Sequence, residues 1–272
     1  MIMKKMKAGF VGFLRGDDPD FWDNMETLSK LGYRGFEGMR FLMRSGGEDA
    51  VKRVKDMGFS TMTCGAGLDE VKNDIKAVIA EAKKIGSGSI TLYSSRIISG
   101  MRATAEGRHC SYEMFMEDVQ AMEQAALTAK DEGLEIWYHN HNTEFSILFD
   151  GYRAMDLMLM QAENVHMMLD VGWCAMGGTD PVIFMKRWPD RMRMLHIKDY
   201  QEAPLRPAWG AKYHSAFTTP GTGVVDIAGV LKLGCELGLE WASVEMDSMN
   251  QLTPMLSLQT AYCNMKEYGW IE

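Results

Sequence analysis

Short apolar runs alternate with longer amphipathic runs along the chain, and this alternation limits the fold more than any other feature. We expect a strand at each of eight apolar runs: Ala8–Leu14, Gly35–Met39, Ser60–Cys64, Ser89–Tyr93, Ile136–His141, His166–Val171, Met192–Lys198 and Ala242–Met246. Apolar residues at helical spacing predict helices outside these runs: Asp18–Leu31, Asp69–Ile85, Tyr112–Glu132, Pro181–Trp188, Ile227–Leu237 and Thr253–Tyr268. Alternating strands and helices favour a parallel sheet with crossover helices.

Eight such units in 272 residues fit one (β/α)8 barrel, a TIM barrel, and we expect residues 1–272 to form this single domain. An open, doubly wound sheet is the alternative, and it usually has a glycine-rich phosphate loop after the first strand. Here Phe13–Asp17 occupies that place and contains no G-x-G-x-x-G pattern. The least regular segments, Ser94–Cys110 and Gln201–Val224, follow strand ends, where a barrel places its active-site loops.

Composition limits the partners of the chain. The net charge is −8, and binding to nucleic acid depends on Lys and Arg that neutralise phosphates, so we do not expect a nucleic-acid partner. No apolar run approaches the ~18 residues that a membrane-spanning helix needs. The five cysteines are scattered, odd in number and without metal-type spacing, which is typical of reduced thiols in a cytoplasmic protein.

Polar side chains occur near the carboxyl ends of the last four predicted strands, at similar depth: His139, Asp170, His196 and Glu245. Asp170 lies 31 residues after His139 and His196 lies 26 residues after Asp170, which is close to one β/α unit each time. Glu245 follows 49 residues later, after a unit and a long loop. The ends of parallel barrel strands converge at one mouth, so the spacing predicts a single site.

Imidazoles and carboxylates together suit one divalent metal ion, with manganese preferred and zinc, cobalt, iron or magnesium as alternatives. A lone Asp at a strand end is more often a cap, and a lone buried His is more often a satisfied core group. Four such positions in successive units favour a metal site. Glu37, at the end of the second predicted strand, faces the same mouth and is a candidate substrate contact.

Four short motifs contain the four strand-end residues, a fifth lies between the last two of these motifs, and all five follow one another in strand order. They are Tyr138-His139-Asn140-His141-x-x-Glu144-Phe145, Leu169-Asp170-Val171-Gly172, His196-Ile197-Lys198-Asp199, Pro220-Gly221-Thr222-Gly223-Val224-Val225-Asp226 and Val244-Glu245-Met246-Asp247. As an ordered set they resemble the sugar phosphate isomerase/epimerase family, within the xylose isomerase-like barrel superfamily. The resemblance extends from about Ala8 to the C-terminus and is strongest from Trp137 to Asp247.

The resemblance implies a metal held by one residue from each of strands five to eight. Asp170, His196 and Glu245 match the family positions directly, whereas the fifth-strand ligand is commonly Glu. Here His139 occupies that place, and His141 is the alternative ligand because it points the same way on an ideal strand. We assign His139 as the ligand and His141 as an acid or base, a task that suits imidazole near neutral pH.

The resemblance also suggests substrate contacts. Trp173 stands where many sugar epimerases of the family have a His that contacts the substrate, and its ring could stack on a sugar. Arg206, in the long segment after the seventh strand, is a further candidate. We expect a small carbohydrate as the partner, and a homodimer or homotetramer as the assembly.

The function that the resemblance implies is isomerisation or epimerisation of a sugar or keto-sugar. A metal bound to the carbonyl acidifies the adjacent C–H and stabilises the enediolate formed when the proton leaves. Glu245 is one proton-transfer group, but the second Glu of the family epimerases is missing. His141 or Lys198 must replace it, and Lys198 could also hold an oxyanion or a phosphate.

The same enediolate can instead expel a β-leaving group, as in inosose dehydratases and enzymes that eliminate aglycones from 3-keto-glycosides. A keto-sugar or keto-inositol lyase is therefore the alternative function. Apurinic-site endonucleases of the superfamily use a metal cluster, for which this acidic chain has too few additional ligands. A non-catalytic sugar-binding or partner subunit is a third alternative, and the intact four-ligand set argues against it.

Overall fold

The computed structural model describes residues 3–97, 110–201, 217–247 and 252–272. Parallel strands form one sheet in the order β3-β2-β1-β13-β10-β9-β6-β5-β4. In chain order these are β1 (Lys7–Phe10), β2 (Gly35–Phe36), β3 (Ser60–Thr61), β4 (Cys64–Ala66), β5 (Ser89–Leu92), β6 (Glu135–His139), β9 (Val165–Asp170), β10 (Met192–Ile197) and β13 (Trp241–Val244).

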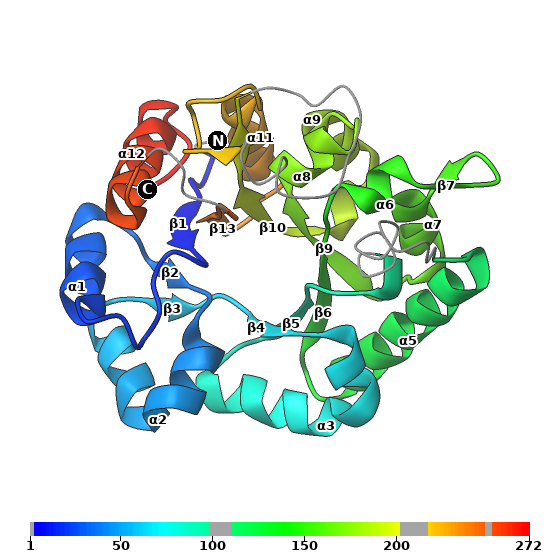
Figure 1. Cartoon of the computed structure of the whole chain (residues 1–272), viewed down its shortest axis with the longest axis horizontal. Helices are drawn as coiled ribbons and strands as arrows, with labels where there is room; N and C mark the ends of the chain where they lie inside the picture. Colours follow the sequence, from blue (N-terminus) through cyan, green and yellow to red (C-terminus); the bar gives the residue numbers. More distant parts are fainter. Residues whose placement is uncertain (1–2, 98–109, 202–216, 248–251) are drawn as a thin grey trace.

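The two strands at the ends of this order are consecutive in the chain, and they close the sheet. β3 pairs with β2, β4 pairs with β5, and only Met62 and Thr63 separate β3 from β4. The predicted third strand is thus split into two short strands that bridge its two neighbours. The strands lie inside a ring of helices (Figure 1), and the predicted (β/α)8 barrel is confirmed.

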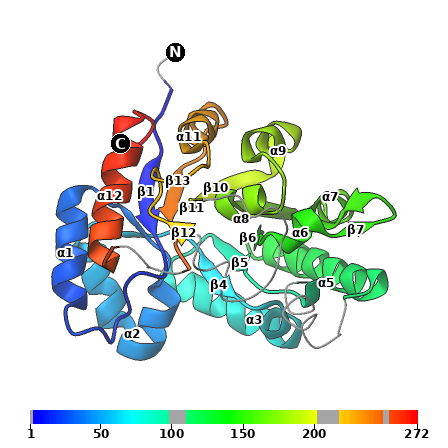
Figure 2. The same cartoon turned by 45° about the horizontal axis from the view of Figure 1, so that its top comes forward.

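The larger helices pack around the outside of the strands (Figure 2). The helices are α1 (Phe21–Leu31), α2 (Met39–Asp56), α3 (Leu68–Ile85), α5 (Tyr112–Asp131), α6 (Thr143–Ser146), α7 (Ala154–Gln161), α8 (Val171–Met176), α9 (Pro181–Arg187), α11 (Ile227–Glu236) and α12 (Pro254–Glu267). The remaining described elements are the 3-10 helix η2 (Pro189–Arg191) and two antiparallel pairs, β7 (Leu148–Phe149) with β8 (Tyr152–Arg153) and β11 (Asp199–Tyr200) with β12 (Phe217–Thr218). No helix in the described ranges is both long and apolar enough to cross a membrane.

The prediction missed α2, and several predicted boundaries were wrong. Ser45-Gly46-Gly47 interrupts the apolar spacing, and the backbone at Gly47 has a φ of 71°, which favours glycine. The second strand ends at Phe36 because Met39 already begins α2. The first strand ends at Phe10 instead of Leu14, and α1 begins at Phe21 instead of Asp18.

Asp199 connects β11 to the glycine-rich motif that begins at Pro220. Its carboxylate accepts backbone N–H bonds from Gly221, Gly223 and Val225 at 3.0, 2.8 and 3.0 Å, and one from Tyr200 at 2.9 Å. One side chain therefore satisfies donors that the turn itself leaves without carbonyl partners. This explains why the His-Ile-Lys-Asp and Pro-Gly-Thr-Gly motifs occur together.

We predict that Asp199→Ala lowers the free energy of unfolding by about 2–4 kcal/mol, because several backbone donors lose a charged acceptor. Chemical denaturation measures the change. The control is Asp226→Ala, which removes only the N-cap bond to Gly229 of α11 and should cost about 1 kcal/mol. A loss at Asp199 no larger than the loss at Asp226 would contradict the anchoring role.

Candidate metal centre

A cavity of about 310 Å³ lies at the carboxyl ends of the barrel strands. Its lining comes from both halves of the barrel: Val11, Glu37, Gly65, Thr91, Tyr93, His139, His141, Met168, His196 and Glu245. Met168 also belongs to a small buried cluster with Met62, Met194 and Trp241, which is separate from the main core. These side chains come from barrel strands or adjoin them, and Met168 is the member of the cluster that lines the cavity.

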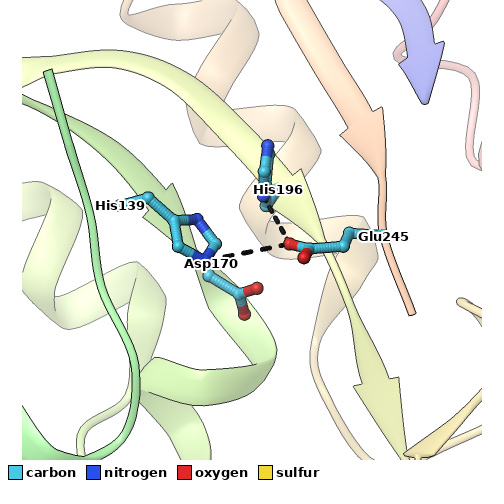
Figure 3. A group of neighbouring side chains, drawn as sticks. All are labelled: His139, Asp170, His196 and Glu245. Atoms are coloured by element: carbon cyan, nitrogen blue, oxygen red, sulfur yellow. Dashed lines mark hydrogen bonds and ion pairs between the residues drawn. The ribbon is translucent and has the colours of Figure 1, made fainter. Parts of the chain in front are cut away.

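Four side chains at this mouth could hold a metal ion: His139, Asp170, His196 and Glu245. Each offers one donor atom, and the four donor atoms lie within 4.8 Å of one another (Figure 3). They come from the ends of β6, β9, β10 and β13, four strands that are neighbours in the sheet. The convergence expected from the sequence spacing is therefore present.

Hydrogen bonds hold both the backbone and the side chain of Asp170. Its Oδ1 accepts the Trp173 N–H at 2.8 Å, which caps α8. The side-chain amide of Asn140 donates to the Asp170 carbonyl at 3.1 Å and accepts the Asp170 N–H at 2.9 Å. Asn140 thus continues the pairing of β6 and β9 past the end of β6. This contact links the Tyr-His-Asn-His motif to the Leu-Asp-Val-Gly motif.

His139 and His141 have different positions, although an ideal strand would align them. β6 ends at His139, and the next residues turn into α6 because the Glu144 carboxylate accepts the His141 N–H at 3.2 Å. Glu144 also accepts the hydroxyls of Tyr138 at 2.7 Å and Thr143 at 2.6 Å. The expectation that the strand extends to His141 was therefore wrong. His139 belongs to the four-donor group, and His141 lines the cavity beside it.

The imidazole of His139 suits a metal ligand. Its Nε2 lies 3.9 Å from Glu245 Oε2, which is too long for a hydrogen bond, and its buried Nδ1 has no hydrogen-bond partner in the described ranges. Burial lowers the pKa of His139 well below its ordinary value. The ring is therefore neutral, which is the form that binds metals.

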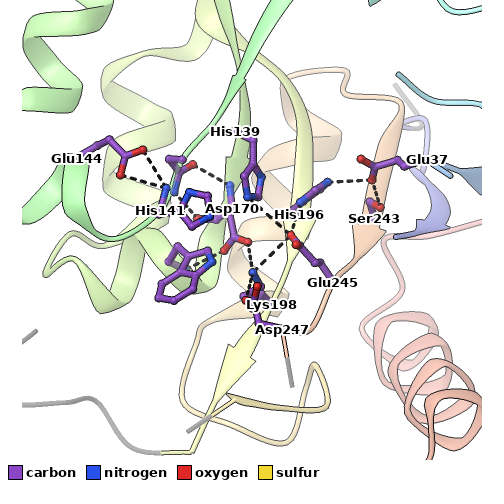
Figure 4. A network of polar contacts seen from close by, with 12 residues as sticks. Glu37, His139, His141, Glu144, Asp170, His196, Lys198, Ser243, Glu245 and Asp247 are labelled. Atoms are coloured by element: carbon purple, nitrogen blue, oxygen red, sulfur yellow. Dashed lines mark hydrogen bonds and ion pairs between the residues drawn. The ribbon is translucent and has the colours of Figure 1, made fainter. Parts of the chain in front are cut away.

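His196 lies between two carboxylates. Its Nδ1 is 2.5 Å from Glu245 Oε2, and its Nε2 is 2.9 Å from Glu37 Oε1 (Figure 4). Burial lowers the pKa of His196, but Glu37 and Glu245 outweigh burial and raise it to about 10. Burial also opposes ionisation of Glu245, but Lys198, His196 and His139 lower the pKa of that carboxyl well below its ordinary value.

Lys198 is fully buried among carboxylates. Its Nζ is 2.9 Å from Asp170, 3.4 Å from Glu245 and 2.6 Å from Asp247. Burial lowers the pKa of Lys198, but these carboxylates outweigh burial and raise it above its ordinary value. A Cβ atom at Gly172 would lie 2.9 Å from Cβ and Cγ of Lys198, so the glycine leaves room for the lysine.

The remaining predicted site residues differ in their positions. Glu37 lines the cavity, but its carboxylate is engaged by His196 and Ser243. Trp173 is buried in α8, its ring lies against those of His141 and Phe217, and it does not line the cavity. Arg206 lies outside the described residues.

Sequence reasoning gave no role to Asn140, Glu144 or Ser243. Asn140 and Glu144 stand inside a motif that we had singled out, so their position in it was a signal. Ser243 had no such signal, because its importance comes from a contact with Glu37, 206 residues away in the chain.

The chain is similar to known proteins along most of its length. An inosose dehydratase of Clostridium botulinum is 22% identical over 274 residues, which cover 89% of this chain and 90% of that protein. A sugar phosphate isomerase/epimerase structure from Parabacteroides distasonis has a TM-score of 0.75 at 19% identity, over 99% of this chain and 100% of the other. The 3-keto-D-glucoside 4-epimerase of E. coli has a TM-score of 0.68 at 12% identity, over 97% of this chain and 100% of the other.

These structural likenesses concern the fold. The family itself follows from the sequence, because the profile of the xylose isomerase-like TIM barrel matches residues 25–262. The chain belongs to the xylose isomerase-like TIM barrel family.

Proposed function

We propose that the chain is an enzyme that uses one divalent metal ion to remove the proton beside the ketone of a keto-sugar or keto-inositol. The observation that carries the proposal is the group of four donor atoms within 4.8 Å, placed beside a cavity that Glu245 and His141 also line. The relatives support it, because dehydratases and epimerases of such substrates occur among the proteins that this chain resembles.

The residues present fit a divalent ion. His139, Asp170, His196 and Glu245 would hold it, with two imidazoles and two carboxylates, a donor set that favours manganese and also suits zinc, cobalt, iron or magnesium. When bound there, the ion supplies positive charge that makes the C–H beside a ketone more acidic. Hydrogen bonds with Asn140 and Trp173 hold one of these proposed ligands, Asp170, in position.

Glu245 and His141 are the proposed proton-transfer groups. They reach the cavity from different strands, since Glu245 follows β13 and His141 follows β6. When a substrate lies between Glu245 and His141, one of these side chains is next to the C–H bond beside the ketone, and the other is next to the hydroxyl that departs. One group takes the proton, the C–H electron pair forms a C=C bond, and the C–O bond breaks. The oxygen leaves as water after taking a proton from the second group.

Two outcomes of proton removal are open, and we place elimination ahead of reprotonation. The inosose dehydratase relative matches 89% of this chain by sequence, at 22% identity, whereas the likeness to isomerases and epimerases rests on structures at 19% and 12% identity. The fifth strand also presents His139 in place of the Glu that is common in the family. An isomerase or epimerase on the same site is the second candidate.

The contacts of Lys198 favour an indirect role. Its Nζ is buried and forms ion pairs with carboxylates, and the side chain does not line the cavity. We propose that it holds Asp170, Glu245 and Asp247 in position by charge. Binding of an oxyanion or a phosphate by Lys198 stays a prediction.

We predict that Asp170→Ala abolishes bound manganese, because it removes a proposed ligand and the anchor of α8. Elemental analysis of purified, manganese-loaded protein measures the content. Asp180→Ala is the matched control, because Asp180 caps α9 in the same way through Ile183 but lies outside the donor group. Full metal content in a folded Asp170→Ala protein would refute the site.

Metal affinity should rise with pH. The pKa of His196 is raised to about 10, so both ring nitrogens of His196 carry a proton at neutral pH when no metal is bound. Burial also raises the pKa of Asp170 to about 7, against the opposing effect of Lys198. A metal must displace these protons, so Mn²⁺ affinity should increase about tenfold per pH unit for each proton released between about pH 6 and pH 8. Titration calorimetry at several pH values tests this, and a flat profile would contradict it.

The reaction outcome can be read directly by NMR. The manganese-loaded protein is incubated in deuterated water with ketoses, inososes and 3-keto-glycosides. We expect loss of water or of an aglycone, which identifies a lyase. Deuterium incorporation without elimination would identify an isomerase or epimerase instead. If neither occurs with any substrate, proton removal beside a ketone is the wrong chemistry.

A further inference from the structure

Glu37 connects the N-terminal half of the barrel to the proposed metal centre. It directly follows β2, its side chain is 7% exposed, and its Oε1 lies 2.9 Å from Nε2 of His196. The same Oε1 accepts a hydrogen bond from the Ser243 hydroxyl (Figure 4). Ser243 on β13 is in register with His196 on β10. Glu37 is thus held from two neighbouring strands before any ligand is present.

The two nitrogens of His196 face different groups. Nδ1 lies 2.5 Å from Glu245 Oε2, within the group of four proposed ligands, and Nε2 faces Glu37. A neutral imidazole carries its proton on one nitrogen and binds a metal through the other. A carboxylate at Nε2 can only accept, so when a metal takes Nδ1, Glu37 keeps the remaining ring proton on Nε2.

We infer that Glu37 is a positioning residue that fixes the ring orientation and tautomer of His196 for metal binding. This replaces the substrate contact predicted from the sequence, because the Glu37 carboxylate is already engaged by His196 and Ser243. The inference rests on the proposed function. It means that Glu37 affects the substrate only through its effect on the metal.

The test compares Mn²⁺ dissociation constants, measured by calorimetry on the full chain, for Glu37→Gln, Glu37→Ala and the unmodified protein. Partners of a ligating histidine typically contribute about 10–100-fold to metal affinity. We expect about 100-fold weaker binding for Glu37→Ala. Glu37→Gln should lose about 10-fold, because its amide oxygen still accepts from Nε2 but carries no charge.

Glu135→Gln is the matched control. Glu135 begins β6 at the opposite end of the barrel, and its Oε1 lies 3.5 Å from Nε2 of His166. Glu135 also lies near an imidazole, but it has no contact with the proposed metal ligands. Its Mn²⁺ dissociation constant should be unchanged. Circular dichroism checks that each variant is folded. If Glu37→Ala is unfolded, the Mn²⁺ affinity of Glu37→Gln tests the inference, because Gln has the same shape as the native residue.

The possible failures are distinguishable. If the unmodified protein binds no Mn²⁺, the proposed function fails. If it binds Mn²⁺ and both folded Glu37 variants bind equally well, only the inference about Glu37 fails. An unchanged metal affinity together with a raised KM would show that Glu37 contacts the substrate, as the sequence had suggested.

Discussion

Buried carboxylates at the mouth of the barrel must be balanced by positive charge, and the rest of the site depends on this requirement. Asp170 has no exposed surface, and Glu245 is mostly enclosed. An unpaired buried carboxylate costs several kcal/mol in desolvation. Lys198 supplies one compensating charge within 2.9 Å of Asp170 and 3.4 Å of Glu245. A divalent ion held by the same carboxylates would supply more.

The fold meets this requirement through short connections at the strand ends. Asp170 ends β9 and caps α8, so one residue is both a proposed ligand and the start of a helix. Gly172 in that helix leaves space for Lys198, which follows β10. The motifs of the C-terminal half are therefore parts of one interlocked structure. The N-terminal half contributes through Glu37, which reaches across to His196.

The sequence predicted the barrel and the four convergent side chains because both follow from periodicity. Strand ends recur at regular spacing, and parallel strands bring their carboxyl ends together. The sequence favoured His139 as the ligand but left His141 as an alternative, because the choice depends on where β6 ends. That end is set by the contact between Glu144 and the His141 N–H. The pairing of Glu37 with His196 spans 159 residues, and no local pattern contains it.

The central claim is that one divalent ion binds among His139, Asp170, His196 and Glu245. The most direct measurement is anomalous X-ray diffraction at the manganese edge, from crystals of the manganese-loaded protein. Our account predicts one strong peak at this mouth of the barrel, in contact with all four side chains. A peak bound by His141 in place of His139, or no peak at this mouth, would contradict it.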